Sequence, residues 1–386
     1  MQLISLEFED PQAGWRLSHA DFFKDITLLV GLSGVGKTRI LDSIRYLKDI
    51  ANGKSSKRFF GLKWHLKFIQ DDISFEWFGE FQKLQATEGG ADYLSFMFDE
   101  NEDDAYRPNL ILERLARNNN IIAERDENGI RLYDQTTPKL SNKESLISIL
   151  RNEEQISVAF HGMNAMLFVD HSEEHRSGRY MPYIKHFEKL TKNSSTIEEI
   201  RSLESPTHIK LALAYQNCRE VFDEISNQFQ EAFPYVKDMS FKFIEIGSFG
   251  IIPRLYITEV GVANPIPEES ISSGMYRTLM HLSRVALWPD GTVILVDEFE
   301  NSFGVNCIHF VTQDLQVHSR RMQFILTSHH PYIINNISMK NWKIVSRIGQ
   351  TVVVEGAERL QKSASHHEAF LQLLNLPQYA EGIATE

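Results

Sequence analysis

The stretch "ITLLVGLSGVGKTRIL", residues 26–41, decides the fold. Its centre fits the pattern G-x-x-x-x-G-K-[ST], and the fixed positions are filled by Gly31, Gly36, Lys37 and Thr38. The apolar run before the loop is typical of a buried parallel strand, and apolar side chains at helical spacing follow it. Strand, glycine-rich loop and helix therefore stand in the order that a phosphate-binding loop requires.

Each part of such a loop has a chemical task. Backbone N–H groups wrap the phosphates, and the N-terminus of the following helix adds partial positive charge. Lys37 is expected to reach the β- and γ-phosphate oxygens, and the Thr38 hydroxyl to ligate Mg²⁺. The residues expected to bind the nucleotide are Gly31, Ser33, Gly34, Val35, Gly36, Lys37, Thr38 and Arg39.

A second apolar strand, "VILV" at 293–296, runs into two acids, Asp297 and Glu298. Two acids at the end of a buried strand cost free energy unless they have a task, although a solvated strand end is the plainer alternative. Asp297 is expected to hold Mg²⁺ through water, and Glu298 to position and deprotonate the attacking water. A glutamate directly after the aspartate favours an ATPase over a GTPase or a small-molecule kinase, so ATP and Mg²⁺ are the expected cofactors.

The segment "ISSGM", residues 271–275, precedes an apolar helical face and stands shortly before the acidic strand. A Ser-Gly turn at a helix N-terminus is an anion site, but in isolation such a pair more often only caps the helix. In this position it is similar to a degenerate form of the ABC signature L-S-G-G-Q. The resemblance assigns the signature to Ser272, Ser273 and Gly274.

A further apolar strand, residues 324–326, ends in "TSHHP". ABC ATPases carry a switch histidine at the end of such a strand, where it hydrogen-bonds the γ-phosphate or the attacking water. The pattern favours His329 over His330, although a lone histidine is more often structural.

The four motifs in this order resemble those of ABC-type ATPases. Gly274 lies too far beyond Gly36 for a transporter subunit, so the SMC, RecF and OLD-like branch fits better. In amino-acid sequence, four motifs are most similar to those of the AriA-like ATPases of the PARIS phage-defence system. These motifs are "VGLSGVGKTRIL", "SSGMYRTLMHL", "VDEFENSFGVN" and "TSHHPYIINN". The glutamine that couples Mg²⁺ to the two lobes in this family is not distinguished among Gln70, Gln82 and Gln155.

The resemblance implies a mechanism and partners. Two copies would pair around two ATP molecules, because each signature caps the γ-phosphate held by the other copy. Glu298 and His329 would be catalytic, and Thr38 and Asp297 would hold the metal. OLD proteins continue into a Toprim nuclease, whereas this chain stops soon after His329. A separate nuclease or toxin effector is therefore expected, with a phage protein as the trigger.

The expected fold class is α/β, an ABC-ATPase head with an antiparallel β-subdomain and a helical insertion. The expected division is lobe one at 1–140, a mostly helical insertion at 141–236, and lobe two with a C-terminal tail at 237–386. Within lobe one, Asn128-Gly129 is a strong hairpin-turn signal.

One long amphipathic helix is expected between Ser205-Pro206 and Pro234, as part of a helical hairpin. Its apolar stripe indicates core packing, with a docking or dimer surface as the alternative; the stripe consists of Phe222, Ile225, Phe229 and Phe233. A second amphipathic helix near 370–374 leaves the same two alternatives open, and core packing is favoured.

Composition narrows the function. The 386 residues carry 40 basic and 52 acidic side chains, and the net charge of −12 disfavours a surface covered in phosphate contacts. DNA is therefore the less favoured partner, although the basic segment "GKSSKRFF" keeps a RecF-like repair clamp as the alternative function. Two cysteines without metal spacing, no signal peptide and no membrane-length apolar run together predict a cytoplasmic protein with no membrane contact.

Overall fold

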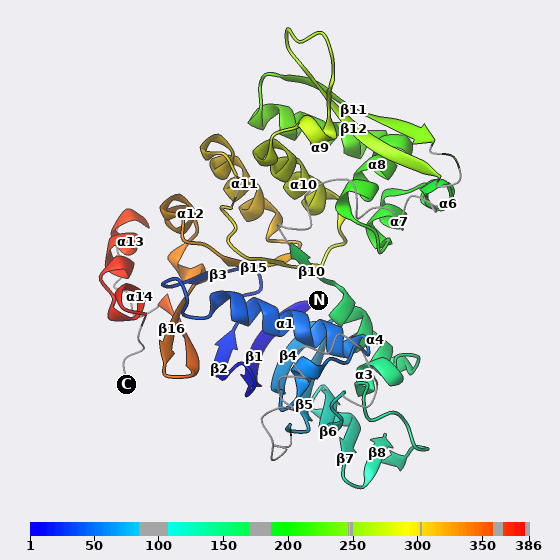
Figure 1. Cartoon of the computed structure of the whole chain (residues 1–386), viewed down its shortest axis with the longest axis vertical. Helices are drawn as coiled ribbons and strands as arrows, with labels where there is room; N and C mark the ends of the chain where they lie inside the picture. The colour runs from blue at the N-terminus through cyan, green and yellow to red at the C-terminus, as the bar shows by residue number, and fades with distance from the viewer. Residues whose placement is uncertain are drawn as a thin grey trace, which may run out of the picture.

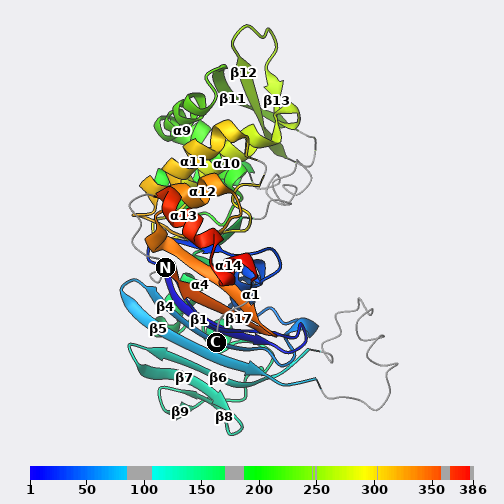
Figure 2. The same ribbon diagram turned by 90° about the vertical axis from the view of Figure 1, so that its left-hand side faces the viewer.

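The computed structural model describes residues 1–84, 107–169, 187–245, 247, 250–301, 303–357 and 366–382. Within these ranges, the molecule contains a mixed sheet of fourteen strands and a separate sheet of three strands. The three-stranded sheet and the strands of residues 120–136 lie at opposite ends of the molecule (Figure 1, Figure 2). The strands of the large sheet, from edge to edge, are β10 (Met166–Val169), β14 (Val293–Val296), β15 (Gln323–Thr327), β3 (Ile26–Val30), β16 (Trp342–Ile348), β17 (Thr351–Gly356), β2 (Trp15–Asp21), β1 (Gln2–Asp10), β4 (Lys63–Gln70), β5 (Ile73–Phe81), β6 (Leu110–Arg117), β7 (Asn120–Asp126), β8 (Gly129–Leu132) and β9 (Gln135–Thr136).

The part of the sheet that carries the phosphate loop is parallel, from β10 through β14, β15 and β3 to β16. Helices cover both of its faces. Leu29 and Leu295 pack on one face with α1 (Lys37–Ala51), whereas Leu28 and Val296 pack on the other with α11 (Val305–His318) and α12 (Pro331–Asn336). Burial on both faces explains why these strands read as unbroken apolar runs.

Strand β1 and strands β4 to β9 pair antiparallel with their neighbours and form the β-subdomain that the sequence predicts. The hairpin turn at Asn128-Gly129 is confirmed, with Asp126 of β7 opposite Gly129 of β8. The short helices α3 (Leu146–Ile149) and α4 (Glu154–Asn164) pack against this subdomain in the same core as α1. The expected α/β fold class is confirmed.

The expected single helix up to Pro234 is wrong, because the chain breaks at Cys218 into α8 (Thr207–Asn217) and α9 (Arg219–Ala232). Cys218 has φ −133 and ψ 63, outside the helical region. The break brings the rings of Tyr215 and Phe222 to 4.9 Å between centroids, whereas seven residues of straight helix would span about 10 Å. Core packing of the apolar stripe is confirmed, since Phe222 and Phe229 are fully buried.

The second sheet and its helices form a separate apolar core. Its strands are β11 (Val236–Glu245), β12 (Ile251–Glu259) and β13 (Ile266–Pro267). The α-helices packed with them are α6 (Phe187–Asn193), α7 (Ile197–Ser202), α8, α9 and α10 (Ser273–Leu287). The remaining elements are η1 (Lys57–Phe59), η4 (Glu268–Ser270), η5 (Met339–Asn341), α13 (His366–Leu374) and α14 (Pro377–Ala380). Leu373 of α13 is fully buried, so the amphipathic helix expected near 370–374 packs into the core through this residue.

Candidate nucleotide site

Strands β14, β15 and β3 are neighbours and parallel, so their C-terminal ends meet at one edge of the sheet. A cavity of about 290 Å³ opens at this edge. Its lining combines the predicted phosphate loop, the predicted acidic pair and the predicted histidine: Ser33, Gly34, Gly36, Lys37, Thr38, Arg39, Asp297, Glu298, Thr327 and His329. The fold therefore brings together residues that lie almost 300 positions apart in the sequence.

The phosphate loop depends on its glycines at two points. Gly36 has φ +116, in the left-handed region, and a Cβ there would lie 2.8 Å from a methyl carbon of Val352. A Cβ on Gly31 would lie 2.3 Å from the carbonyl oxygen of Val345. Both positions therefore require glycine for the loop to keep this shape.

Lys37 is buried and its ammonium group donates hydrogen bonds to the carbonyls of Gly31 at 2.7 Å and Leu32 at 2.8 Å. Burial lowers the pKa of Lys37 to about 8, against the opposing charges of Asp297, Glu300 and Glu298. Burial therefore disfavours the charged form of Lys37, and the negative charge of a bound phosphate would stabilise that form.

The Thr38 hydroxyl donates to Asp297 Oδ2 at 2.8 Å. The hydroxyl and the carboxylate are hard oxygen donors, the ligand type that Mg²⁺ prefers, and Mg²⁺ in nucleotide sites takes few protein ligands beside water and phosphate. Within the described ranges, no group of three or more His, Cys, Asp or Glu side chains is placed to hold a metal by itself. A Thr-Asp pair completed by phosphate oxygens and water fits this chemistry.

Thr327 at the end of β15 is a site residue that the motif search did not single out. Its buried hydroxyl donates to Asp297 Oδ1 at 2.6 Å and accepts the backbone N–H of Glu298 at 2.7 Å. One threonine therefore sets the position of both acids. The signal was present in "TSHHP", where a hydroxyl residue ends an apolar strand that pairs with the acidic strand.

Glu298 has φ +46, a left-handed conformation that is rare for a residue with a side chain. The turn after it is held by Phe299 N–H, which donates to the Thr327 carbonyl at 2.9 Å, and by Asn301 N–H, which donates to the Glu298 carbonyl at 2.7 Å. Such a conformation persists only where the surroundings hold it, and here it places Glu298 on the cavity wall.

His329 lies on the same wall, and its backbone N–H donates to Glu300 Oε1 at 2.6 Å. Burial, and then the Lys37 charge, lower the pKa of His329 against the raising effect of three nearby carboxylates. The imidazole is therefore neutral at pH 7, with one nitrogen able to donate and the other to accept.

The residues predicted to form the signature lie elsewhere. Ser272 is the N-cap of α10, and its hydroxyl accepts the N–H of Met275 at 3.2 Å. Neither Ser272, Ser273 nor Gly274 lines the cavity beside Lys37. This placement accommodates both alternatives from the sequence, a plain helix cap and a surface offered to a second copy.

The three candidate glutamines of the coupling loop, Gln70, Gln82 and Gln155, are also absent from the cavity lining. Gln70 instead donates to the neighbouring Asp71 carboxylate at 2.8 Å and packs against Gly162. The choice among the three stays open.

The family described as "AAA domain, putative AbiEii toxin, Type IV TA system" matches residues 26–335. The match runs from the first residue of β3 to within α12, so it includes the loop, the signature region, the acidic strand and the histidine. The chain belongs to this family. It is a P-loop ATPase domain, and none of the described helices is long and apolar enough to cross a membrane.

The chain is also similar to solved SMC head structures. One is an SMC head bound to the C-winged helix domain of ScpA, at 14% identity over 92% of this chain and 97% of that chain, with a TM-score of 0.46. The Thermotoga maritima SMC head domain is 11% identical over 92% of this chain and 99% of that chain, with a TM-score of 0.42. The Pyrococcus furiosus Smc head with an extended coiled coil, bound to the C-terminal domain of ScpA, is 15% identical over 96% of this chain and 98% of that chain, with a TM-score of 0.44. Among curated proteins, none matches the chain.

Proposed function

We propose that this chain hydrolyses ATP and works as a pair of copies with two ATP molecules held between them. The observation that carries the proposal is the single cavity where Lys37, Thr38, Asp297, Glu298 and His329 meet. When bound, Mg²⁺–ATP supplies the phosphate bond to be cleaved and a metal charge that favours the cleavage.

The residues of the cavity divide the work. The loop amides and Lys37 hold the phosphates, while Thr38 and Asp297 hold the metal. Glu298, fixed by its backbone bond to the Thr327 hydroxyl, orients the attacking water and accepts its proton. His329, neutral near pH 7, hydrogen-bonds the γ-phosphate or that water.

Pairing follows from the signature. The N-terminus of α10 has positive dipole character, which favours an anion. Because Ser272–Gly274 do not line the cavity of their own chain, we assign them to the γ-phosphate bound by the second copy. ATP then stabilises the closed pair by its higher affinity for that state, and hydrolysis removes the stabilisation.

We further propose that the pair is the sensor or regulatory subunit of a cytoplasmic antiphage complex, similar to AriA-like ATPases. It would hold a separate nuclease or toxin, with a Toprim nuclease as one candidate, and release it when a phage protein binds. The family description, which names a toxin and a toxin–antitoxin system, supports a role beside an effector protein.

The alternative is a RecF-like DNA-repair ATPase that clamps DNA. The basic segment at residues 53–60 is the feature in its favour, but Lys54 there forms an ion pair with Asp49 at 2.7 Å. Part of the local charge is thereby neutralised within the chain, which favours the defence role.

One experiment separates the two roles. The protein is purified with the products of its neighbouring genes, and its ATPase rate is measured with and without duplex DNA at two salt concentrations. A stoichiometric nuclease or toxin partner supports the defence role. No such partner, together with salt-sensitive DNA binding that stimulates hydrolysis, contradicts it and supports repair.

A further inference from the structure

The inner face of the signature helix α10 touches the turn that carries Glu298. Arg277 lies one turn beyond Gly274 and is 4% exposed. Its guanidinium Nη1 donates to the Asn301 carbonyl at 2.5 Å. A charged donor at this distance makes a strong hydrogen bond, and burial strengthens it further.

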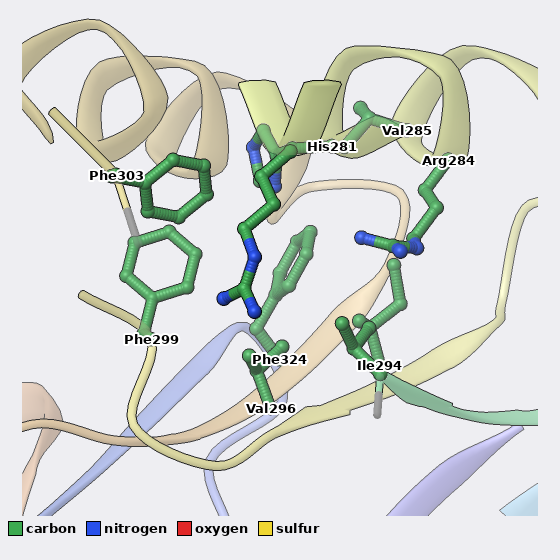
Figure 3. A pocket seen from close by; sticks show the side chains of 10 residues that line it. His281, Arg284, Val285, Ile294, Val296, Phe299, Phe303 and Phe324 are labelled. Atoms are coloured by element: carbon green, nitrogen blue, oxygen red, sulfur yellow. The ribbon is translucent and has the colours of Figure 1, made fainter. Parts of the chain in front are cut away.

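A second contact lies one turn along the same helix. The His281 ring is 5.8 Å from the Phe299 ring and 6.3 Å from the Phe303 ring, both edge to face. Figure 3 shows His281 on the helix, with the rings of Phe303 and Phe299 to its left. Helix α10 therefore contacts the turn by a hydrogen bond at Asn301 and by ring packing on both sides of Asn301.

The turn itself is short and tied to the site. Asn301 N–H donates to the Glu298 carbonyl, and Glu298 N–H donates to Thr327, which also holds Asp297. A displacement of the Asn301 carbonyl is thus passed to the backbone of Glu298 through a single turn. Because Glu298 is held in the left-handed region, small backbone shifts change where its carboxylate points.

We propose that Arg277 is a positioning residue that couples the two nucleotide sites of the pair. The inference rests on the proposed function, in which Ser272–Gly274 contact the ATP held by the other copy. Occupation of that distant site sets the position of α10, and Arg277 passes this position to the Asn301 carbonyl and so to Glu298 of its own site. Each copy then hydrolyses efficiently only when its signature holds the partner's nucleotide.

The test compares Arg277→Met and Arg277→Lys with the wild type. Methionine keeps an apolar stem of similar length and removes the donor, whereas lysine keeps one charged donor. Ser283→Ala is the matched control, since the Ser283 hydroxyl is buried on the same helix and, among the residues that the structure describes, donates to the Leu279 carbonyl and not to the turn. ATP binding, ATP-dependent pairing, kcat and the Hill coefficient of hydrolysis are measured for each.

For Arg277→Met we expect ATP binding and pairing as in the wild type, a kcat lower by roughly 10- to 100-fold, and a Hill coefficient reduced towards 1. Arg277→Lys should recover part of the lost kcat and part of the lost Hill coefficient, and Ser283→Ala should match the wild type in all four measurements. If Arg277→Met does not fold, Arg277→Lys decides by the same readouts.

A wild-type kcat and Hill coefficient in the Arg277 variants would overturn the coupling role while leaving the proposed function intact. A wild-type protein that binds ATP without hydrolysis or pairing would instead overturn the proposed function, and the coupling with it.

Discussion

At the scale of single residues, two groups of the candidate nucleotide site are in energetically unfavourable states in the free protein. Lys37 is buried and its ammonium group donates to two carbonyls of its own loop, and Glu298 has a left-handed backbone. Both costs are relieved by a bound nucleotide or by the surrounding hydrogen bonds, which is typical of sites prepared for charged ligands.

The lowered pKa of Lys37 predicts a pH effect on ATP binding. With this pKa of about 8, the free protein has lost about half of its Lys37 protons at pH 8, whereas bound phosphates raise the pKa again, so binding should take up a proton around pH 8 and up to the ordinary value of 10.5. The folded free state holds fewer protons than the unfolded chain in this window, so its stability rises with pH there. Calorimetry in buffers of different ionisation enthalpy measures the uptake, and Lys37→Ala should abolish both it and ATP binding.

Glu298→Gln should bind ATP with near wild-type affinity and lower kcat by roughly 10²- to 10⁴-fold, because the amide cannot accept the proton of the attacking water. The same variant should accumulate as the closed pair in ATP, which size-exclusion chromatography with light scattering detects. Rapid turnover by Glu298→Gln would remove the glutamate from its assigned role.

Thr327→Val tests the residue that the motif search missed. Valine keeps the shape and removes the hydroxyl that serves Asp297 and Glu298, so we expect a kcat lower by roughly tenfold with little loss of ATP affinity. Thr312→Val is the matched control, because within the described part of the chain the buried Thr312 hydroxyl donates to the Ile308 carbonyl of its own helix and not to the acidic pair. Equal kcat in the two variants would show that Thr327 has no positioning role.

At the scale of elements, α10 and α11 are joined by a buried contact between a histidine and a carboxylate. Asp314 of α11 lies 3.1 Å from His281 Nε2 and 3.3 Å from His318 Nε2. Burial alone would raise the pKa of Asp314, but the two histidines outweigh it and lower the pKa to about 2. The carboxylate therefore holds the signature helix against its neighbour.

The sign of this effect gives a prediction for Asp314→Asn. Because the folded-state pKa is below the unfolded value of 3.8, the contribution is fully present above pH 4 and is lost as pH falls towards 2. We expect the variant to unfold with roughly 2 kcal/mol less free energy at pH 7, and the difference to shrink below pH 4. Urea titrations across this range measure it, and a constant difference would contradict the pairing.

Several elements were predictable from local sequence, and the exceptions have physical reasons. The phosphate loop, the acidic strand and the hairpin at Asn128-Gly129 were predictable because each depends on neighbouring residues. The break at Cys218 was not, because the edge-to-face contact of Tyr215 with Phe222 forms only after the helix direction changes. Thr327 and Arg277 were missed for the same reason: their partners, Asp297 and Asn301, lie about 25 to 30 residues away.

At the scale of the whole molecule, the parallel strands place the site at one sheet edge, while the signature lies outside the cavity at the start of α10. The β-subdomain and the second sheet lie at opposite ends of the molecule, on either side of this edge (Figure 2). The central claim of the proposed function is that a second copy supplies the signature and completes this site.

Mixing two inactive variants tests that claim most directly. Lys37→Ala lacks a working loop and Gly274→Tyr a working signature, so each alone should hydrolyse ATP very slowly. A mixed pair contains one complete site, formed by the loop of the Gly274 variant and the signature of the Lys37 variant. We predict that mixing restores hydrolysis clearly above that of either variant alone, at a rate per complete site below the wild type, because the signature of the Gly274 variant holds no nucleotide and the coupling through Arg277 is lost. No recovery on mixing, or a Gly274→Tyr protein as active as the wild type, would contradict a site shared between two copies.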